Sequence, residues 1–251
     1  MMVGFDPIDS SKILFGIATV GSFLTMYIFL RRFIGQLPAT AGAMIYTLFP
    51  YHAINTYVRG ALSEQFGYLI IPLIFMALLK LLSKSSEKKS FYWALLLGLF
   101  GGLLILSHNL SALMCAIVLV PVVIGGVFYT KNKKLLLGYI FFAGTIAIGL
   151  SAFYLVPMVF ESSYTNVSSQ VGGGADFRYH FVCFGQLWSG GWGFGGSTQG
   201  CVDGMSFRLG KVNVLLFVVS VFYVCYQIAV TKRVKDFNIF YIGIYIVLFS
   251  L

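Results

Sequence analysis

Three polar side chains suited to anion binding lie in one short segment between two long apolar stretches. They are His52, Arg59 and Glu64. The planar fork of an arginine matches two phosphate oxygens, and a neighbouring carboxylate can fix its orientation. His52 could donate a hydrogen bond to the same anion. The segment therefore predicts an anion clamp, with one open alternative: an interfacial Arg59–Glu64 ion pair within an aromatic belt.

A second histidine-bearing segment, Ser107-His108-Asn109, interrupts another apolar stretch. Two interpretations of His108 stay open. The first is a polar cap for a helix end, and the second is a further donor to the anion bound near Arg59. The second requires His108 to lie on the same side of the molecule as His52, Arg59 and Glu64. Convergence of separate loops on one side is what a lipid-headgroup site needs.

A long polar segment, predicted as a loop over residues 158–211, carries glycines and two tryptophans in Trp188-Ser189-Gly190-Gly191-Trp192. Loops of this length are typical of functional or mobile regions. The tryptophans could stack on sugar faces or lie at the lipid headgroup level, and both alternatives stay open. Cys183 and Cys201 are predicted to be close enough for a disulfide on an oxidising side of a membrane. No spacing of cysteine and histidine is typical of a structural zinc site.

The elements that position these residues are predicted to be membrane helices. The chain has 251 residues, of which 59% are hydrophobic and only 10% charged, whereas a soluble domain carries about 25% charged residues. The sequence therefore predicts an all-α, polytopic transmembrane helix bundle in a lipid bilayer. A net charge of +9 could suggest nucleic-acid binding. We exclude nucleic acid, because most of the positive charge lies in short turns between apolar stretches.

Eight spans are predicted, each close to the ~20 residues that cross a bilayer core. The stretch 91–129 is too long to cross once, and we split it at Ser107-His108-Asn109 into a helical hairpin. The predicted spans cover residues 12–30, 36–54, 65–82, 91–106, 110–129, 135–157, 212–230 and 237–251.

Charge asymmetry predicts the orientation of these spans. With the basic clusters at 31–35, 83–90, 130–134 and 231–236 on the cytoplasmic side, most of the 17 Lys and Arg residues are cytoplasmic and most of the 8 acids external. Segments 55–64 and 158–211 are then external. We expect a single transmembrane domain over residues 1–251. The acidic start and the abrupt apolar end suggest a fragment truncated at both ends.

Several motifs follow one another along the chain: PYHAINTYVRGALSEQFGYLIIPL, LSHNLSAL, FYLVPMVFESSY, and GQLWSGGWGFGGS with DGMSFRLG. In this order they resemble, over essentially the whole chain, a family of large bacterial membrane proteins labelled 6-pyruvoyl-tetrahydropterin synthase-related. That family is similar to the GT-C glycosyltransferases. These transfer sugars from polyprenyl-phosphate donors on the outer membrane face. The resemblance implies a GT-C-like, multi-pass protein of a bacterial plasma membrane.

The resemblance also implies roles for particular residues. Catalysis would require cationic donors for the departing lipid phosphate, for which Arg59 and His108 are the candidates. A carboxylate would remove a proton from the acceptor hydroxyl, and the candidates are Glu64, Glu161 and Asp176. GT-C enzymes carry their catalytic acid in the first outer loop. Here that region is reduced to residues 5–9, and neither of its aspartates is assigned as the base.

Two further questions stay open at this point. A divalent metal ion could be held by the external carboxylates with several waters retained, although the sequence shows no metal site. The alternative to an enzyme is a non-catalytic membrane protein, either a transporter or flippase-like subunit or a scaffold for envelope assembly. A coupled transporter would tend to show internal repeats and charges at mid-bilayer, and the chain shows neither clearly.

Overall fold

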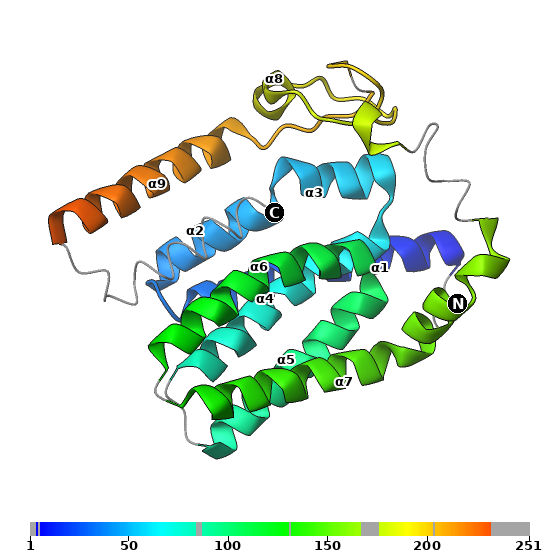
Figure 1. Ribbon diagram of the computed structural model, residues 1–251. Coiled ribbons are helices and arrows are strands. Elements are labelled where there is room, and N and C mark those ends of the chain that lie inside the picture. Colours follow the sequence, from blue (N-terminus) through cyan, green and yellow to red (C-terminus); the bar gives the residue numbers. More distant parts are fainter. Residues whose placement is uncertain are drawn as a thin grey trace.

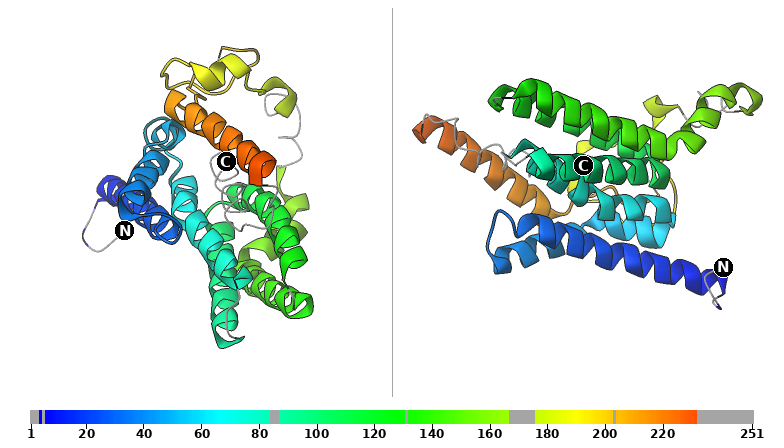
Figure 2. Two further views of the ribbon diagram at one scale, coloured as in Figure 1. Left: turned by 90° about the vertical axis from the view of Figure 1, so that its left-hand side faces the viewer. Right: turned by 90° about the horizontal axis from the view of Figure 1, so that it is seen from below.

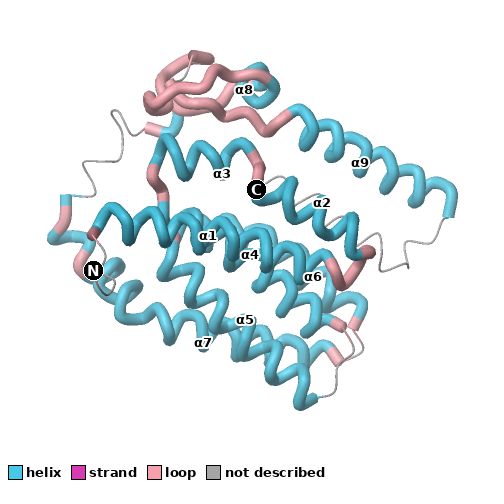
Figure 3. The backbone as a smooth tube through the Cα atoms, turned by 180° about the vertical axis from the view of Figure 1, so that it is seen from behind, coloured by secondary structure: helices cyan, strands magenta, loops and turns pink. Residues whose placement is uncertain are grey.

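The computed structural model describes residues 4, 6–83, 87–130, 132–166, 176–202 and 204–231. This part of the chain is helical and contains no strand. Long helices lie side by side in a bundle. The shorter helices α2 and α3 and the segment around α8 lie along one flank of this bundle (Figures 1 and 3). The principal helices are α1 Pro7–Leu30, α2 Gln36–Thr47, α3 Pro50–Ile54, α4 Leu62–Leu82, α5 Glu87–Ser107, α6 Asn109–Tyr129, α7 Lys133–Phe160, α8 Phe184–Trp188 and α9 Lys211–Thr231.

Five of these helices are long and apolar enough to cross a membrane: α1, α4, α5, α6 and α7. The prediction of a membrane helix bundle is therefore confirmed at this level. Helix α9 coincides with the predicted span 212–230, but its crossing of the bilayer stays a prediction. The predicted span 237–251 lies outside the described residues. The basic clusters at 84–86, 131 and 232–235 also lie outside them.

The prediction of one continuous helix over 36–54 is wrong. Helix α2 ends at Thr47, and a new helix, α3, begins at Pro50. The cause is Pro50, because its ring disfavours helical backbone in Phe49, which takes an extended ψ of 133°. With 12 residues, α2 is about 18 Å long, well short of the ~30 Å hydrocarbon core. The residues around this break, including Phe49 and His52, form one wall of a pocket.

The predicted hairpin within 91–129 is confirmed. Helix α5 ends at Ser107 and α6 begins at Asn109. Between them His108 has extended backbone, and its ring accepts a hydrogen bond from the Ser111 amide, which caps α6. Helix α5 runs in one direction and α6 runs back, so the two ends of the hairpin lie on the same side of the bundle. The basic clusters at both ends predicted this arrangement.

Helix α4 forms the centre of the bundle. Of its most apolar stretch, 61% of residues are buried, against 17–33% in the other four candidate spans. Ile74, Phe75 and Leu78 are almost fully buried, and α1 and α5 pack on α4. Glu64 and the rest of the first turn of α4 are thereby fixed relative to the bundle.

Glycines bring α5 and α7 into close contact. Gly98 and Gly102 form a small-xxx-small pattern, which lets helix backbones approach within a membrane. A Cβ on Gly98 would lie 2.7 Å from the backbone oxygen of Ala143, and one on Gly102 would lie 2.8 Å from Leu150 Cδ2. These contacts hold the helical hairpin against α7.

The ends of the helices divide between two sides of the bundle. In the right-hand view of Figure 2, the ends of α1 and α9 and the start of α7 point to one side, while the N-terminus and the end of α7 point to the other. The first set borders basic clusters and the second borders the acidic start and the segment 158–211. This arrangement agrees with a single rule of sidedness for the bundle.

We predict that Gly98→Val lowers the free energy of unfolding by about 1–3 kcal/mol, because the added methyl groups overpack the α5–α7 contact. Gly144→Val is the matched control, since a Cβ on Gly144 meets nothing within 4 Å. Unfolding by SDS in mixed micelles measures both variants. Equal loss of stability in the two variants would show that the α5–α7 contact is not tightly packed.

We also predict the sidedness of two loops. A cysteine introduced at Ser197 should react with an impermeant maleimide on intact cells, and one at Asn132 should react only after permeabilisation. The positive-inside asymmetry is the physical reason. The labelling of each variant is compared with that of the parent protein, and only the excess is counted. Protection at Ser197 or labelling at Asn132 in intact cells contradicts this orientation.

Candidate anion-binding pocket

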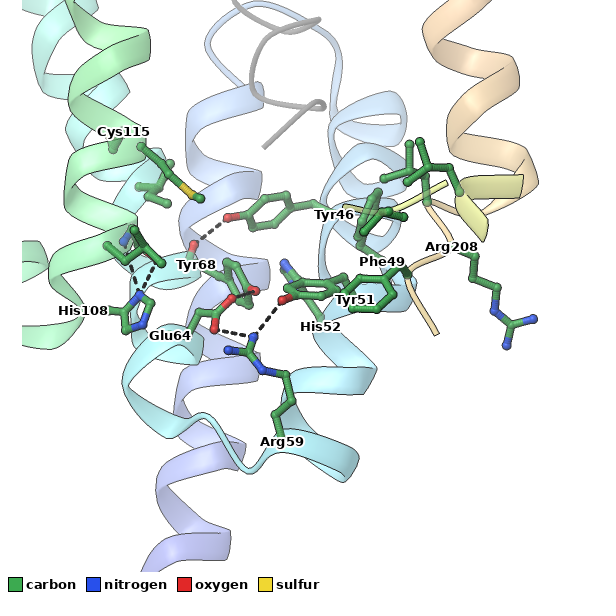
Figure 4. A pocket seen from close by; sticks show the side chains of 18 residues that line it. Tyr46, Phe49, Tyr51, His52, Arg59, Glu64, Tyr68, His108, Cys115 and Arg208 are labelled. Atoms are coloured by element: carbon green, nitrogen blue, oxygen red, sulfur yellow. Dashed lines mark hydrogen bonds and ion pairs between the residues drawn. The ribbon is translucent and has the colours of Figure 1, made fainter. Parts of the chain in front are cut away.

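A pocket of about 390 Å³ lies where α3, α4, α6 and the segment 182–209 meet. We call it the Arg59 pocket. It brings together four of the residues singled out in the sequence, namely His52, Arg59, Glu64 and His108 (Figure 4). Its other lining residues are mostly apolar or aromatic: Tyr46, Phe49, Tyr51, Tyr68, Ile71, Leu110, Ser111, Met114, Cys115, Val182, Leu187, Phe207, Arg208 and Leu209.

A single π-turn over Asn55–Arg59 positions the arginine. The turn ends at Gly60, whose φ of +60° is in the left-handed region that glycine adopts without steric cost. The Ala61 amide then donates to the Asn55 carbonyl at 2.9 Å, and α4 begins directly afterwards. Arg59 is thereby turned back towards the first residues of α4.

One nitrogen of Arg59 makes all its hydrogen bonds to protein. Nη1 lies 2.7 Å from Glu64 Oε2, 2.7 Å from Tyr51 Oη and 2.6 Å from Asn55 Oδ1. Within the described part of the chain, Nε and Nη2 have no protein partner, and the side chain is one third exposed. The guanidinium is therefore held through Nη1, while the N–H groups of Nε and Nη2 have no protein acceptor among the described residues.

Glu64 is enclosed by donors. The residue is 8% exposed, and Oε2 pairs with Arg59. Its other oxygen, Oε1, accepts a hydrogen bond from the Tyr68 hydroxyl at 2.9 Å. The Tyr68 hydroxyl in turn accepts from Asn55 Nδ2, which closes a ring of hydrogen bonds. A buried carboxyl group requires this degree of compensation, so Glu64 is held in place as the partner of Arg59.

His108 caps a helix and also lines the pocket, and its role as a donor to an anion stays a prediction. Its Nδ1 accepts from the Ser111 amide at 3.2 Å and lies 2.7 Å from Ser111 Oγ, which is a helix cap. The residue also lines the Arg59 pocket. Because Nδ1 acts as the acceptor, the proton of neutral His108 is assigned to Nε2. That nitrogen remains available as a donor.

His52 occupies the opposite wall. Its ring stacks on Tyr68, with centroids 3.8 Å apart and an interplanar angle of 13°. Burial lowers the pKa of His52 to about 4, so the ring is neutral at physiological pH. Its Nδ1 is buried without a hydrogen-bond partner in the described part of the chain. His52 is thus a neutral wall residue and not a second cation.

The other predicted carboxylates do not line this pocket. Glu161 is an exposed residue at the end of α7. Asp176 pairs with Arg178 at 2.6 Å, and the hydrogen bonds from Arg178 lower the pKa of Asp176. At the N-terminus, Asp6 caps α1 and Asp9 pairs with Lys12. Among the described residues, no three His, Cys, Asp or Glu side chains gather as a metal site would require.

The segment 182–209 closes the pocket from one side and is itself cross-linked. Cys183 and Cys201 form a disulfide, with their Cα atoms 5.5 Å apart. Backbone hydrogen bonds also join Gly195 to Gly204 and Leu187 to Leu209. These links hold Leu187 and Leu209 in place as part of the pocket wall.

Sequence reasoning missed the role of Tyr68 and Tyr46. Tyr68 lies four residues after Glu64, a spacing that places two side chains on the same face of a helix. That spacing was a usable signal. The Tyr46 hydroxyl donates to the Tyr68 carbonyl at 2.8 Å. No pattern in the sequence indicates this contact, since it depends on how α2 packs against α4.

A family model described as 6-pyruvoyl-tetrahydropterin synthase related domain, membrane protein, matches residues 2–171. The chain belongs to this family. The part that matches the PTPS-related family contains Arg59, Glu64, His52 and His108, while residues 182–209 follow it along the chain. No match was found among curated proteins or among solved structures.

We predict that Arg59→Ala lowers the free energy of unfolding by about 1–3 kcal/mol, because Glu64 is left buried without its counter-charge. Lys12→Ala is the control. Its partner Asp9 is well exposed, so the change should cost less than about 0.5 kcal/mol. SDS unfolding in micelles measures both, and Glu64→Gln in the Arg59→Ala background should restore part of the loss. If Arg59→Ala lowers the free energy of unfolding no more than Lys12→Ala does, the Arg59–Glu64 pair does not stabilise the fold.

Proposed function

We propose that this protein is a GT-C-like integral membrane glycosyltransferase that holds a polyprenyl-phosphate-linked sugar in the Arg59 pocket. The observation that supports this most is the open face of Arg59 at the polar end of a mainly apolar pocket. We further propose that the reaction takes place on the outer face of a bacterial plasma membrane, because the pocket lies at the predicted external ends of the helices.

The arrangement suits a phosphate leaving group. As the bond between sugar and phosphate breaks, negative charge increases on the phosphate oxygens, and fixed donors stabilise it. Arg59 is already oriented by Glu64, Tyr51 and Asn55, so little reorganisation is needed. Nε2 of His108 supplies another donor in the same pocket. In this proposal Glu64 is a positioning residue, because both of its oxygens are occupied.

The apolar part of the pocket suits the lipid chain. Leu110 and Met114 line the pocket and are each about half exposed on α6. Further along the same helix, Ile117, Val120 and Ile124 are also exposed. A polyprenyl chain that leaves the pocket past Leu110 would therefore meet apolar side chains for several helical turns. These side chains would keep the polyprenyl chain in apolar surroundings while its phosphate is bound.

A second candidate function is a non-catalytic protein that binds lipid phosphate, such as a flippase-like subunit or a scaffold for envelope assembly. The observation that favours it is the state of the carboxylates. Glu64 is paired, and neither Glu161 nor Asp176 lines the pocket. The described pocket residues thus include no unpaired carboxylate to take a proton from an acceptor, and no step is assigned to a metal ion.

The test uses the protein in nanodiscs with farnesyl phosphate, a short isoprenoid phosphate, and with farnesol as the uncharged control. We expect farnesyl phosphate to bind more tightly than farnesol. Arg59→Lys should weaken binding of farnesyl phosphate about tenfold, a loss of ~1.4 kcal/mol, because an ammonium cannot reproduce the bidentate fork. Arg178→Lys, outside the pocket, should leave binding unchanged.

A turnover assay separates the two candidate functions. Polyprenyl-phosphate mannose with a radiolabelled sugar is supplied, and release of mannose or its transfer to cell-envelope extract is followed. Arg59-dependent turnover supports the transferase. Arg59-dependent binding without turnover supports the non-catalytic protein. Equal binding of farnesyl phosphate by the parent and Arg59→Lys refutes both, since both place the phosphate on Arg59.

A further inference from the structure

A second hollow, of about 440 Å³, lies between α3, the end of α8 and the start of α9. We call it the Trp188 groove. It is lined by Pro50, Ala53, Ile54, Trp188, Ser189, Trp192, Ser206, Arg208, Gly210 and Lys211. Arg208 lines both this groove and the Arg59 pocket. Figure 4 shows its guanidinium pointing away from the Arg59–Glu64 pair.

The charge of the groove has one sign. Arg208 and Lys211 are cations, and none of the lining residues is acidic. Within the part of the chain that the structure describes, neither cation forms a salt bridge. Lys211 Nζ instead lies 5.6 Å from the centre of the Trp188 ring, a cation–π distance. Two cations without a carboxylate partner favour an anionic ligand.

The remaining surface suits a ring with both apolar and hydroxyl groups. Trp188 and Trp192 are each about half exposed. Lys211 Nζ lies over one face of the Trp188 ring, so a sugar would stack on the opposite face of Trp188 and on Trp192. Ser206 lies among the lining residues, is 2% exposed, and has an Oγ without a hydrogen-bond partner in the described part of the chain. The volume is far larger than a bare phosphate needs, because one water molecule occupies about 30 Å³ in the liquid.

Covalent and hydrogen-bonded cross-links fix the walls of the groove. The Cys183–Cys201 disulfide and the backbone hydrogen bonds of Gly204 with Gly195 and Gly196 cross-link the segment that carries both tryptophans. On the other side, Gly210 has a φ of +86°, and a Cβ there would lie 3.1 Å from Pro50 Cγ. Glycine thus allows the chain to pass close against α3. Preformed walls lower the entropy cost of binding.

We propose that the Trp188 groove binds an anionic saccharide, meaning a sugar that carries a carboxylate or a phosphate. The tryptophans stack on the sugar ring, and Arg208 and Lys211 bind its negative group. The inference goes beyond the lipid-phosphate pocket and does not depend on it. Since Arg208 lines both hollows, the saccharide would lie directly beside the Arg59 pocket.

Tryptophan fluorescence provides the test. The chain has three tryptophans, so in a Trp93→Phe background only Trp188 and Trp192 emit. The protein in nanodiscs of neutral lipid is titrated with glucuronate, glucose 6-phosphate, glucose and inorganic phosphate. We expect glucuronate or glucose 6-phosphate to change the emission, with an affinity at least tenfold higher than that of glucose and of inorganic phosphate.

Variants then locate the site. Arg208→Ala and Lys211→Ala should each weaken binding of the anionic sugar about tenfold, whereas Arg178→Ala, in the same segment but outside the groove, should not. Gel filtration and an unchanged count of free thiols show that each variant is folded. Calorimetry of the Trp192→Ala variant, which lacks one stacking face, should also show at least tenfold weaker binding.

Four results would overturn the proposal. Inorganic phosphate that binds as tightly as the sugars would indicate a bare anion site, and glucose that binds equally well would indicate a neutral sugar site. A response to phosphatidylglycerol nanodiscs that depends on Arg208, without any response to the sugars, would indicate a lipid interface. No response to any probe would exclude binding at this groove. None of these results bears on farnesyl phosphate and Arg59, so the two proposals fail separately.

Discussion

The burial of Glu64 is the constraint on which the site depends. A carboxylate that is 8% exposed at the start of an apolar helix must find donors for both oxygens. Arg59 and Tyr68 supply them, and they reach Glu64 only because the π-turn reverses the chain at Gly60 and because four residues separate Glu64 from Tyr68. Since α4 is the most buried helix of the bundle, this network is anchored to the core.

The same pair sets a trade-off between attraction and orientation. Glu64 neutralises much of the positive charge of Arg59, which weakens long-range attraction of an anion. In exchange, the carboxylate fixes the guanidinium so that Nε and Nη2 remain together on its open side. Recognition in the Arg59 pocket then depends more on geometry than on net charge. In the proposed function this would suit a ligand delivered from the bilayer, because its lipid chain would bring the phosphate to the pocket.

Of the eight spans that hydropathy and charge predicted, five correspond to helices long and apolar enough to cross a membrane. Those five and the hairpin at Ser107-His108 could be predicted because they follow from bilayer thickness and from the positive-inside rule. Pro50 indicates a helix break in the sequence as well. The prediction missed the break because the hydropathy of residues 36–54, taken together, is that of a single span. The short connection from Arg59 to Glu64 was enough to expect them to be close. The ring through Asn55 and Tyr68 was not predictable, since it depends on side-chain directions set by the π-turn.

The two hollows draw on different parts of the chain. The donors of the Arg59 pocket come from the part that matches the PTPS-related family, whereas both tryptophans of the Trp188 groove and its two cations come from the disulfide-linked segment and the residues after it. In the proposed function, a phosphate at Arg59 would contact helix ends that the bundle core holds in place. The segment that carries the tryptophans also contributes Leu187 and Leu209 to the wall of the Arg59 pocket. The two hollows therefore share a wall as well as Arg208, and a change in that segment would alter both of them.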